Sequence, residues 1–431
     1  MRISREWIAH AFFTLVEHGA IRVLDALTTL VLIRILGGLH FGMFSVYQSW
    51  VGLVLLVLPY AELSLYRDYG TLKATGELGP QLATFKTYNF IKLALAAAIA
   101  MSLALPEKGD IYSARISLLG FAMALPLSQS FYGFMRDPLR FERQQHLVAM
   151  VSSVQKICLI GAMIAAFYSY PGNVPVLFGG AMAVYVVFAF VWAKAARNVV
   201  PRARQSLREF AGRLKKIMRG TVLWIHVNGV ITGTVLTLDI LMLNAVKADL
   251  EEIGRYSIAL KAAGFFQLIP MALANSFGVY LGKWQHSQNP RKEQKAMYAL
   301  VAVFSAMCFA LFKVAYHFGM PILDFIGKHK ITGDAFTRVM QYYYWQMFGL
   351  MLMSAAFPLS TYLGARAPLK KITVQIFIPW FLFAALTYRI AAGHGLLYAA
   401  RANVVTYGAL CVGMVVFYLV NRRTFEKGKG A

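Results

Sequence analysis

The chain has few charged residues, and acidic residues are the scarcest of them. Only 14% of its 431 residues are charged, with 19 Asp and Glu against 43 Lys and Arg, whereas 58% are hydrophobic. A water-soluble fold of this composition would have too little polar surface to cover its core. The three cysteines, Cys158, Cys308 and Cys411, lie far apart inside apolar runs. They predict neither a disulfide framework nor a metal site.

The N-terminal segment lacks the pattern of a cleavable signal peptide. Arg2 and Arg5 precede an apolar run, but Glu17, Arg22 and Asp25 interrupt it. The apolar region of a signal peptide is short and uninterrupted. We therefore expect this segment to form the first membrane helix.

What the sequence does contain is a series of about twelve apolar segments, each near the ~20 residues needed to cross a bilayer. In the first half these segments are His10–Leu36, Phe41–Leu63, Thr84–Leu105, Ile111–Gly133, Leu147–Tyr168 and Val174–Trp192. In the second half they are Thr221–Val246, Ser257–Leu281, Ala296–Phe318, Gln341–Leu363, Thr373–Ala391 and Leu396–Val420. The series predicts an all-α polytopic membrane protein with two six-helix bundles.

Basic residues crowd alternate connections between these segments. With the N-terminus inside, the inner connections hold Arg67, Lys73, Lys86, Arg136, Arg140, Arg143, Lys283, Arg291, Lys292, Lys295, Arg366, Lys370 and Lys371. The outer connections hold acids such as Asp249, Glu251 and Glu252. This asymmetry predicts that both termini are cytoplasmic. Topology and anionic lipid headgroups explain the net charge of +24, so we expect membrane lipids and no nucleic acid as partners.

The longest polar stretch, Lys194 to Arg219, divides the chain near its middle. We expect an N-terminal bundle at 1–193, a basic cytoplasmic linker at 194–219 and a C-terminal bundle at 220–431. Residues Ser206–Met218 have the pattern of a basic amphipathic helix on the inner leaflet. This stretch serves either as a topology anchor or in a regulatory or partner-binding role.

The two halves contain a weak repeat. Phe41-Gly42-Met43-Phe44-Ser45-Val46 opens the second segment, and Ile253-Gly254-Arg255-Tyr256-Ser257-Ile258 opens the eighth. An aspartate precedes each, Asp25 in one half and Asp239 in the other. The repeat predicts two bundles of the same orientation, with a ligand bound between them.

The first helix of each half carries a polar stripe. On a helical wheel Glu17, His18, Arg22 and Asp25 share one arc with threonines, opposite aliphatic residues. Arg22 and Asp25 are spaced for an ion pair, whereas Glu17 has no partner three or four residues away and is a candidate for ion coupling. The seventh segment repeats the stripe with Asn228, Thr232 and Asp239.

The remaining charges inside the apolar segments are mainly cationic. Ionisable groups at this depth usually face a cavity or a partner. Lys92 and Lys313 lie near segment ends, where they either snorkel to the interface or face the lumen. The candidate lumen cations that would bind an anionic substrate are Arg22, Arg34, Lys156, Lys261 and Arg401. Such a lumen favours phosphate and repels cations.

The stretch Leu32–Ser45 resembles a known motif. Arg34-Ile35-Leu36-Gly37-Gly38-Leu39-His40-Phe41-Gly42-Met43-Phe44 is similar to the Arg-x-Leu-Gly-x-x-x-Phe-Gly-x-Tyr/Phe segment of polysaccharide exporters. These exporters belong to the multidrug/oligosaccharidyl-lipid/polysaccharide (MOP) superfamily. The stretch from Asp239 to Tyr256 resembles the second-half counterpart, so the resemblance covers essentially the whole chain.

The resemblance implies an O-antigen-type oligosaccharide flippase of the bacterial inner membrane. Such a protein has two bundles arranged as a V around a central cavity and works by alternating access. The implied substrate is a polyprenyl-diphosphate-linked glycan for O-antigen or exopolysaccharide synthesis. The implied protein is a monomer without a cofactor or metal, coupled to H⁺ or Na⁺, with contacts to polysaccharide assembly proteins.

Other functions stay open at this point. An integral-membrane polymerase, ligase or glycosyltransferase would place its chemistry on a large outer loop. The longest outer connection, about Gly319 to Met340, contains Asp324 and Asp334 but no clustered acids or nucleophile–base pair. A multidrug exporter should have an acidic lumen. A major-facilitator transporter should have a fuller version of Arg67-Asp68-Tyr69-Gly70. We therefore expect a transporter, not an enzyme.

Overall fold

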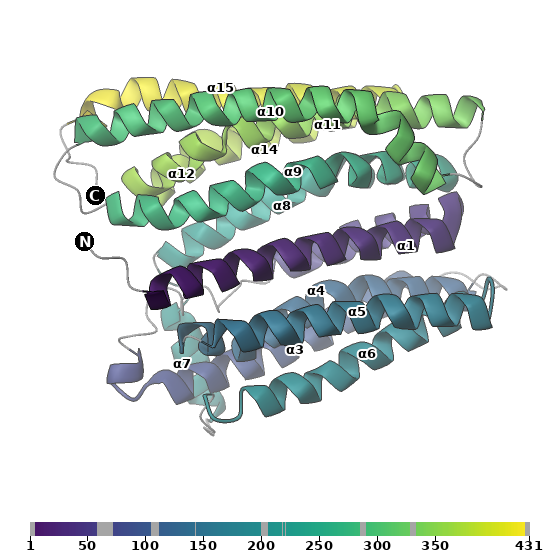
Figure 1. Cartoon of the computed structure of the whole chain (residues 1–431), viewed down its shortest axis with the longest axis horizontal. Helices are drawn as coiled ribbons and strands as arrows, with labels where there is room; N and C mark the ends of the chain where they lie inside the picture. The colour runs from purple at the N-terminus through teal and green to yellow at the C-terminus, as the bar shows by residue number, and fades with distance from the viewer. Residues whose placement is uncertain are drawn as a thin grey trace. The chain divides into compact units, whose positions relative to one another are not determined.

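The chain folds into long helices with short connections (Figure 1). The computed structural model describes residues 5–57, 72–104, 112–142, 144–199, 206–217, 219, 221–284, 290–327 and 333–426. Some side chains within these ranges, including those of residues 5–20 and Arg22, lie outside the described part. The described residues contain no strand, as expected for an all-α protein.

The chain divides into two compact units. The first comprises Met1–Leu36 with Tyr47–His226, and the second comprises Gly37–Val46 with Val227–Ala431. The short segment Gly37–Val46 therefore lies with the second unit, although it falls within the predicted N-terminal bundle. The division into 1–193, 194–219 and 220–431 stays a prediction.

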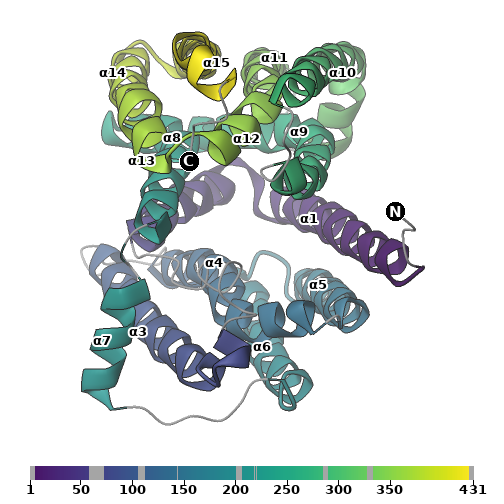
Figure 2. The same cartoon turned by 90° about the vertical axis from the view of Figure 1, so that its left-hand side faces the viewer.

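The helices of the first unit follow the predicted segments. They are α1 (Arg5–Val57, whose middle belongs to the second unit), α3 (Leu78–Ala104), α4 (Tyr112–Phe141), α5 (Gln145–Ser169), α6 (Val174–Ala195) and α7 (Leu207–Ile217). However, α1 runs through the first two of the predicted segments, and α3 and α4 are longer than predicted. Figure 2 shows α3, α4, α5 and α6 end-on as a bundle. Local sequence sets their ends: Gly172 supplies a positive φ of 78° before α6, and the Asn173 side chain accepts a hydrogen bond from the Val176 amide at 3.2 Å.

The predicted amphipathic helix is confirmed as α7. A capping box starts it, because the Ser206 amide donates to the Glu209 carboxylate at 2.9 Å and the Glu209 amide donates to Ser206 Oγ at 3.3 Å. Hydrogen bonding to Ser206, from its backbone amide first and then its side chain, lowers the pKa of Glu209. The Arg213 guanidinium forms an ion pair with Glu77, immediately before α3.

The second unit contains the remaining helices. They are α8 (Thr221–Ala245, which begins in the first unit), α9 (Leu250–Trp284), α10 (Pro290–Gly327), α11 (Asp334–Ala355), α12 (Phe357–Arg366), α13 (Leu369–Ile372), η1 (Thr373–Phe377), α14 (Ile378–Gly393) and α15 (Leu396–Glu426). One predicted span is broken into α11 and α12, with Pro358 in the first turn of α12. Another begins with a π-helical turn, η1.

The repeat motif marks a place of close backbone packing inside the second unit. Gly37 has φ 67° and ψ −176° and kinks α1. A methyl group on Gly42 would lie 1.9 Å from the Leu250 carbonyl oxygen, and one on Gly254 would lie 1.9 Å from the Gly38 carbonyl oxygen. The corresponding glycines of the two halves thus let α1 and α9 meet backbone to backbone.

Eight described helical segments are long and apolar enough to cross a membrane. They are Val23–Leu53, His146–Ser169, Val174–Ala195, Leu223–Ala245, Met297–Pro321, Asp334–Gly364, Leu369–Gly393 and Leu396–Arg422. The further helices α3, α4 and α9 have 27, 30 and 35 residues. Each exceeds the ~20 residues that a span requires.

Candidate functional site

The acid predicted in the first helix has a lysine as its described partner. Lys156 Nζ of α5 lies 2.6 Å from Asp25 Oδ1 of α1, and the two side chains are 16% and 35% exposed. The structure therefore brings together two predicted site residues that lie far apart in sequence. The predicted Arg22–Asp25 pair and the side chains of Glu17 and His18 lie outside the described residues.

The acid of the second half lies in a buried polar cluster. Asp239 of α8 is 3% exposed. Its carboxylate accepts hydrogen bonds from the Tyr256 hydroxyl of α9 at 2.7 Å and from the Ile240 amide at 2.8 Å. Burying a carboxylate is costly unless it is hydrogen-bonded and compensated. These two donors satisfy the first condition.

The cluster continues through α11, α14 and α15. Asn403 donates to the Tyr256 hydroxyl at 3.2 Å and accepts from the Tyr388 hydroxyl at 2.5 Å. Gln346, fully buried, donates to the Tyr256 backbone carbonyl at 3.4 Å. We refer to Asp239, Tyr256, Gln346, Tyr388 and Asn403 as the Asp239 cluster. It joins five helices of one unit through side-chain and main-chain polar contacts.

Lys261, a predicted lumen cation, lies on α9 and is partly buried. It interacts electrostatically with Asp239, so the two groups lie in the same part of the second unit. The carboxylate of Asp25 is held by an ion pair with Lys156, whereas that of Asp239 is held by hydrogen bonds.

The other predicted cations lie in more open surroundings. Arg34 is exposed. Arg401 is also exposed, and its guanidinium lies 5.3 Å from the Trp345 ring centre and 5.5 Å from that of Tyr398. The guanidinium therefore lies beside two aromatic rings in an exposed position, where it can take part in cation–π interactions.

Lys92 and Lys313, which the sequence left between snorkelling and facing the lumen, differ in their exposure. Lys92 of α3 is only 2% exposed and lies 4.7 Å from the Tyr88 ring centre, so its side chain is buried within the protein. Lys313 of α10 is exposed and lies 5.6 Å from the Phe309 ring centre. Lys92 thus becomes a stronger candidate for a role in the interior than the sequence indicated.

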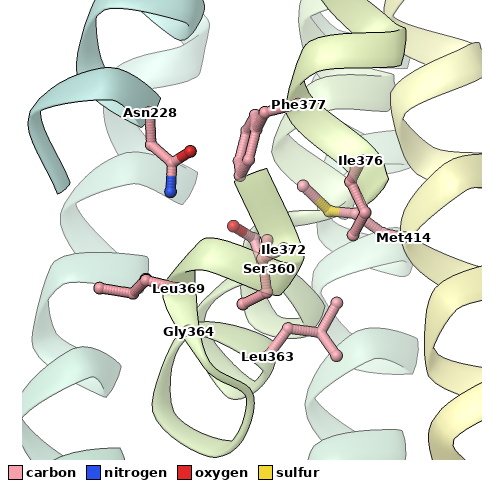
Figure 3. Close-up of a pocket in the computed structure, with 9 residues that line it drawn as sticks. All are labelled: Asn228, Ser360, Leu363, Gly364, Leu369, Ile372, Ile376, Phe377 and Met414. Atoms are coloured by element: carbon pink, nitrogen blue, oxygen red, sulfur yellow. The ribbon is translucent and has the colours of Figure 1, made fainter. Parts of the chain in front are cut away.

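A small cavity lies between α8, α12, η1 and α15 of the second unit (Figure 3). Its volume is about 150 Å³, and it is lined by Asn228, Ser360, Leu363, Gly364, Leu369, Ile372, Ile376, Phe377 and Met414. The Asn228 amide oxygen accepts a hydrogen bond from Thr373 Oγ1 at 2.7 Å. Asn228 therefore faces a mostly apolar space, while the predicted Thr232 is partly buried on the same helix.

Sequence reasoning missed the partners that complete the Asp239 cluster. Tyr256 lies within the recognised repeat motif, but a tyrosine in an apolar segment has no pattern that reveals its hydrogen-bond acceptor. Asn403 follows the predicted Arg401 by two residues and points elsewhere because successive helical residues diverge by about 100°. Among the described residues, no group of three or more His, Cys, Asp or Glu could hold a metal ion.

Comparison with known proteins gives a fold and no close relative. No family model matches the chain, and no curated protein matches it in sequence. An outward-facing multidrug-resistance MATE transporter of the MOP superfamily superposes with a TM-score of 0.57 at 14% identity, covering 97% of this chain and 96% of that chain. A variant of a MATE transporter from Vibrio cholerae gives 0.55 at 10% identity, covering 96% and 97%.

A third structure comes from Pyrococcus furiosus. This MOP superfamily transporter is described as having a binding pocket of reversed polarity that suggests a different function. It superposes with a TM-score of 0.53 at 12% identity, covering 99% of this chain and 94% of that chain. The chain is therefore a multi-pass helical membrane protein. It has the fold that the MATE transporters of the MOP superfamily share.

Proposed function

We propose that this protein is a flippase that moves a polyprenyl-diphosphate-linked oligosaccharide across the bacterial inner membrane. The glycan would serve O-antigen or exopolysaccharide synthesis. The fold supports transport by alternating access. The motif in Leu32–Ser45 supports the polysaccharide branch of the superfamily.

The observation that carries this proposal is the charge balance of the spans. Inside the eight candidate spans the described acidic side chains are Asp239, Asp25 near the start of its span, and Asp334 at the first residue of its span. Asp25 is paired with Lys156 and Asp239 is hydrogen-bonded within its cluster, and the spans also carry the exposed cations Arg34 and Arg401. An exporter of organic cations needs uncompensated carboxylates, and a diphosphate needs cationic groups. The described charges therefore favour an anionic substrate.

The rival with a specific observation in its favour is multidrug export, because two of the three structures above are MATE transporters. The Pyrococcus furiosus transporter supports our proposal of an anionic substrate, since a pocket of reversed polarity has been described within the same fold. At such low identity a shared fold does not identify the substrate, which depends on the side chains of the binding site.

We further propose that the Asp239 cluster couples transport to protons. A buried carboxylate that takes up a proton can change state during a cycle. Gln346 Oε1 is buried with no hydrogen-bond partner among the described residues and adds an acceptor nearby. Glu17 is the second coupling candidate, on sequence grounds alone.

The test is translocation in sealed proteoliposomes. A fluorescent polyprenyl-diphosphate oligosaccharide is added, and exposure of its glycan to an external glycosidase is followed over time. The variants are Arg22→Ala, Lys261→Ala and Arg401→Ala, with Lys313→Ala as the matched control. Loss of one charge-assisted phosphate contact, about 1.5–3 kcal/mol, should slow exposure about 10–100-fold at low substrate.

The same vesicles separate the rival functions. Export of ethidium without glycan exposure would establish the multidrug function instead. A lengthened or transferred glycan, seen by mass spectrometry, would establish an enzyme. If all three variants and the control transport equally well, the cationic binding site is wrong.

A further inference from the structure

The amphipathic helix α7 lies across one end of the first unit. In Figure 1 the helices α3 to α6 run lengthwise and α7 crosses them at their left-hand end, and Figure 2 shows it beside α3 in the end-on view. The chain enters α3 and leaves α6 at this same end. A helix in this position lies parallel to the surface of a membrane that the bundle spans.

Protein contacts hold one side of α7 in place. Arg213 pairs with Glu77, and the capping box of Ser206 and Glu209 fixes the first turn. Ile217 is buried, while Phe210 and Leu214 are partly buried. These contacts fix the orientation of the helix, with Phe210, Leu214 and Ile217 on one apolar face.

This apolar face continues into an exposed strip that basic residues border. Leu207 is 82% exposed, and Ala211, four residues later on the same face, is also exposed. Arg208 and Lys215 are seven residues apart, so they lie together along the edge of this apolar strip, and both are exposed. An apolar strip bordered by long cationic side chains is the arrangement of helices that bind the membrane interface.

The charge around α7 is unbalanced. The described acids at this end have partners: Glu77 pairs with Arg213, Glu142 with Lys73 at 2.5 Å, Asp137 with Arg140 at 3.0 Å, and Glu209 accepts a hydrogen bond from the Ser206 amide. The exposed cations here are Lys86, Lys194, Arg197, Arg208, Lys215, Lys216 and Arg219. The surface is therefore complementary to a strongly anionic one.

We propose that α7 is a docking surface for anionic phospholipid, with Leu207 inserted below the headgroups and Arg208 and Lys215 bound to lipid phosphates. The occupant is the inner leaflet that surrounds the protein. This inference does not depend on the transported substrate. Docking would fix the end of the first unit at the membrane surface and would weaken when the anionic lipid is removed.

The test uses the full chain in lipid nanodiscs. A cysteine-free background (Cys158→Ala, Cys308→Ala and Cys411→Ala) carries Leu207→Cys, labelled with an environment-sensitive fluorophore. Acrylamide quenching is compared between pure phosphatidylcholine and phosphatidylcholine with phosphatidylglycerol. We expect a blue-shifted, protected label only with phosphatidylglycerol. Molar salt should remove the protection, because the Debye length falls to about 3 Å at 1 M.

Two variants locate the effect. In Arg208→Gln/Lys215→Gln the ratio of protected to quenched label should fall about 30-fold, since each cation near an anionic surface contributes about fivefold. The matched control Lys216→Gln/Lys247→Gln removes the same net charge, but neither residue borders the apolar strip, and it should keep most of the protection. Thermal unfolding in detergent checks that both variants fold.

Three outcomes would overturn the proposal. Equal protection in both lipids would show that α7 packs only against protein. Equal loss of label protection in the double variant and its control would show that the protection depends only on net charge. Protection in phosphatidylcholine by an added DNA duplex, matching that from phosphatidylglycerol, would replace the lipid with a soluble polyanion.

Discussion

Single residues inside the helices combine structural and functional demands. A carboxylate buried among apolar helices must be hydrogen-bonded, and Asp239 meets this condition through Tyr256. Its hydrogen bonds and its charge can be separated experimentally, because asparagine keeps the shape and one acceptor but loses the charge.

Asp239→Ala leaves the buried Tyr256 hydroxyl without its acceptor. We expect it to lower stability by about 1–3 kcal/mol. Asp239→Asn should be closer to the parent in thermal unfolding in detergent, yet its transport should no longer respond to a proton gradient. Equal destabilisation by the two variants would mean that the charge interaction with Lys261, not the hydrogen bonds, dominates the cluster.

The pair of Asp25 and Lys156 makes a second residue-scale prediction. Lys156→Ala should destabilise the protein because Asp25, 35% exposed, then lacks its partner. Partial exposure places the coupling energy below the 3–5 kcal/mol of a fully buried pair, at about 1–2 kcal/mol. A double-mutant cycle with Asp25→Ala measures it, and the exchange Asp25→Lys/Lys156→Asp should recover part of the loss. Additive single effects would show that the pair contributes nothing.

At the scale of elements, the length of the apolar segments predicts where the helices lie, but it does not predict their local geometry. The segment Val174–Trp192 was placed correctly to within a turn of α6, because periodicity and length alone define a span. The π-helical turn Thr373–Phe377 was not predicted, since it depends on what packs around Asn228 and Ile376. The hydrogen-bond partners of Asp239 were not predicted, for the same reason. Hydrogen bonds between distant helices have no sequence period.

The glycine contact between α1 and α9 gives the element-scale prediction. Gly42→Ala or Gly254→Ala places a methyl group 1.9 Å from a backbone oxygen, so the helices must separate. We expect a loss of about 1–3 kcal/mol or more in thermal stability. The matched control is Gly264→Ala on α9, where the added methyl meets no atom within 4 Å. Alanine there should be neutral or stabilising, by up to ~1 kcal/mol. If this contact does not contribute to stability, all three variants will have the same thermal stability.

At the scale of the whole molecule, the contacts of the two predicted acids each lie within one unit. Asp25 and Lys156 both belong to the first unit, and Asp239 and Tyr256 both belong to the second. Alternating access, the mechanism we propose, moves bundles largely as rigid bodies. Contacts contained within one unit survive such a movement.

The orientation of the whole chain in the membrane is the last prediction, and it follows from the distribution of Lys and Arg. The basic linker that contains α7 should be cytoplasmic and the connection around Lys247 should be periplasmic. In the cysteine-free background, Lys247→Cys should react with a membrane-impermeant maleimide in cells with a permeabilised outer membrane. Lys216→Cys, on α7 but away from its apolar strip, should react only after lysis. Both positions are exposed in the structure, so burial cannot account for a difference between them. The reverse pattern would invert the topology and move the docking surface of α7 to the outer leaflet.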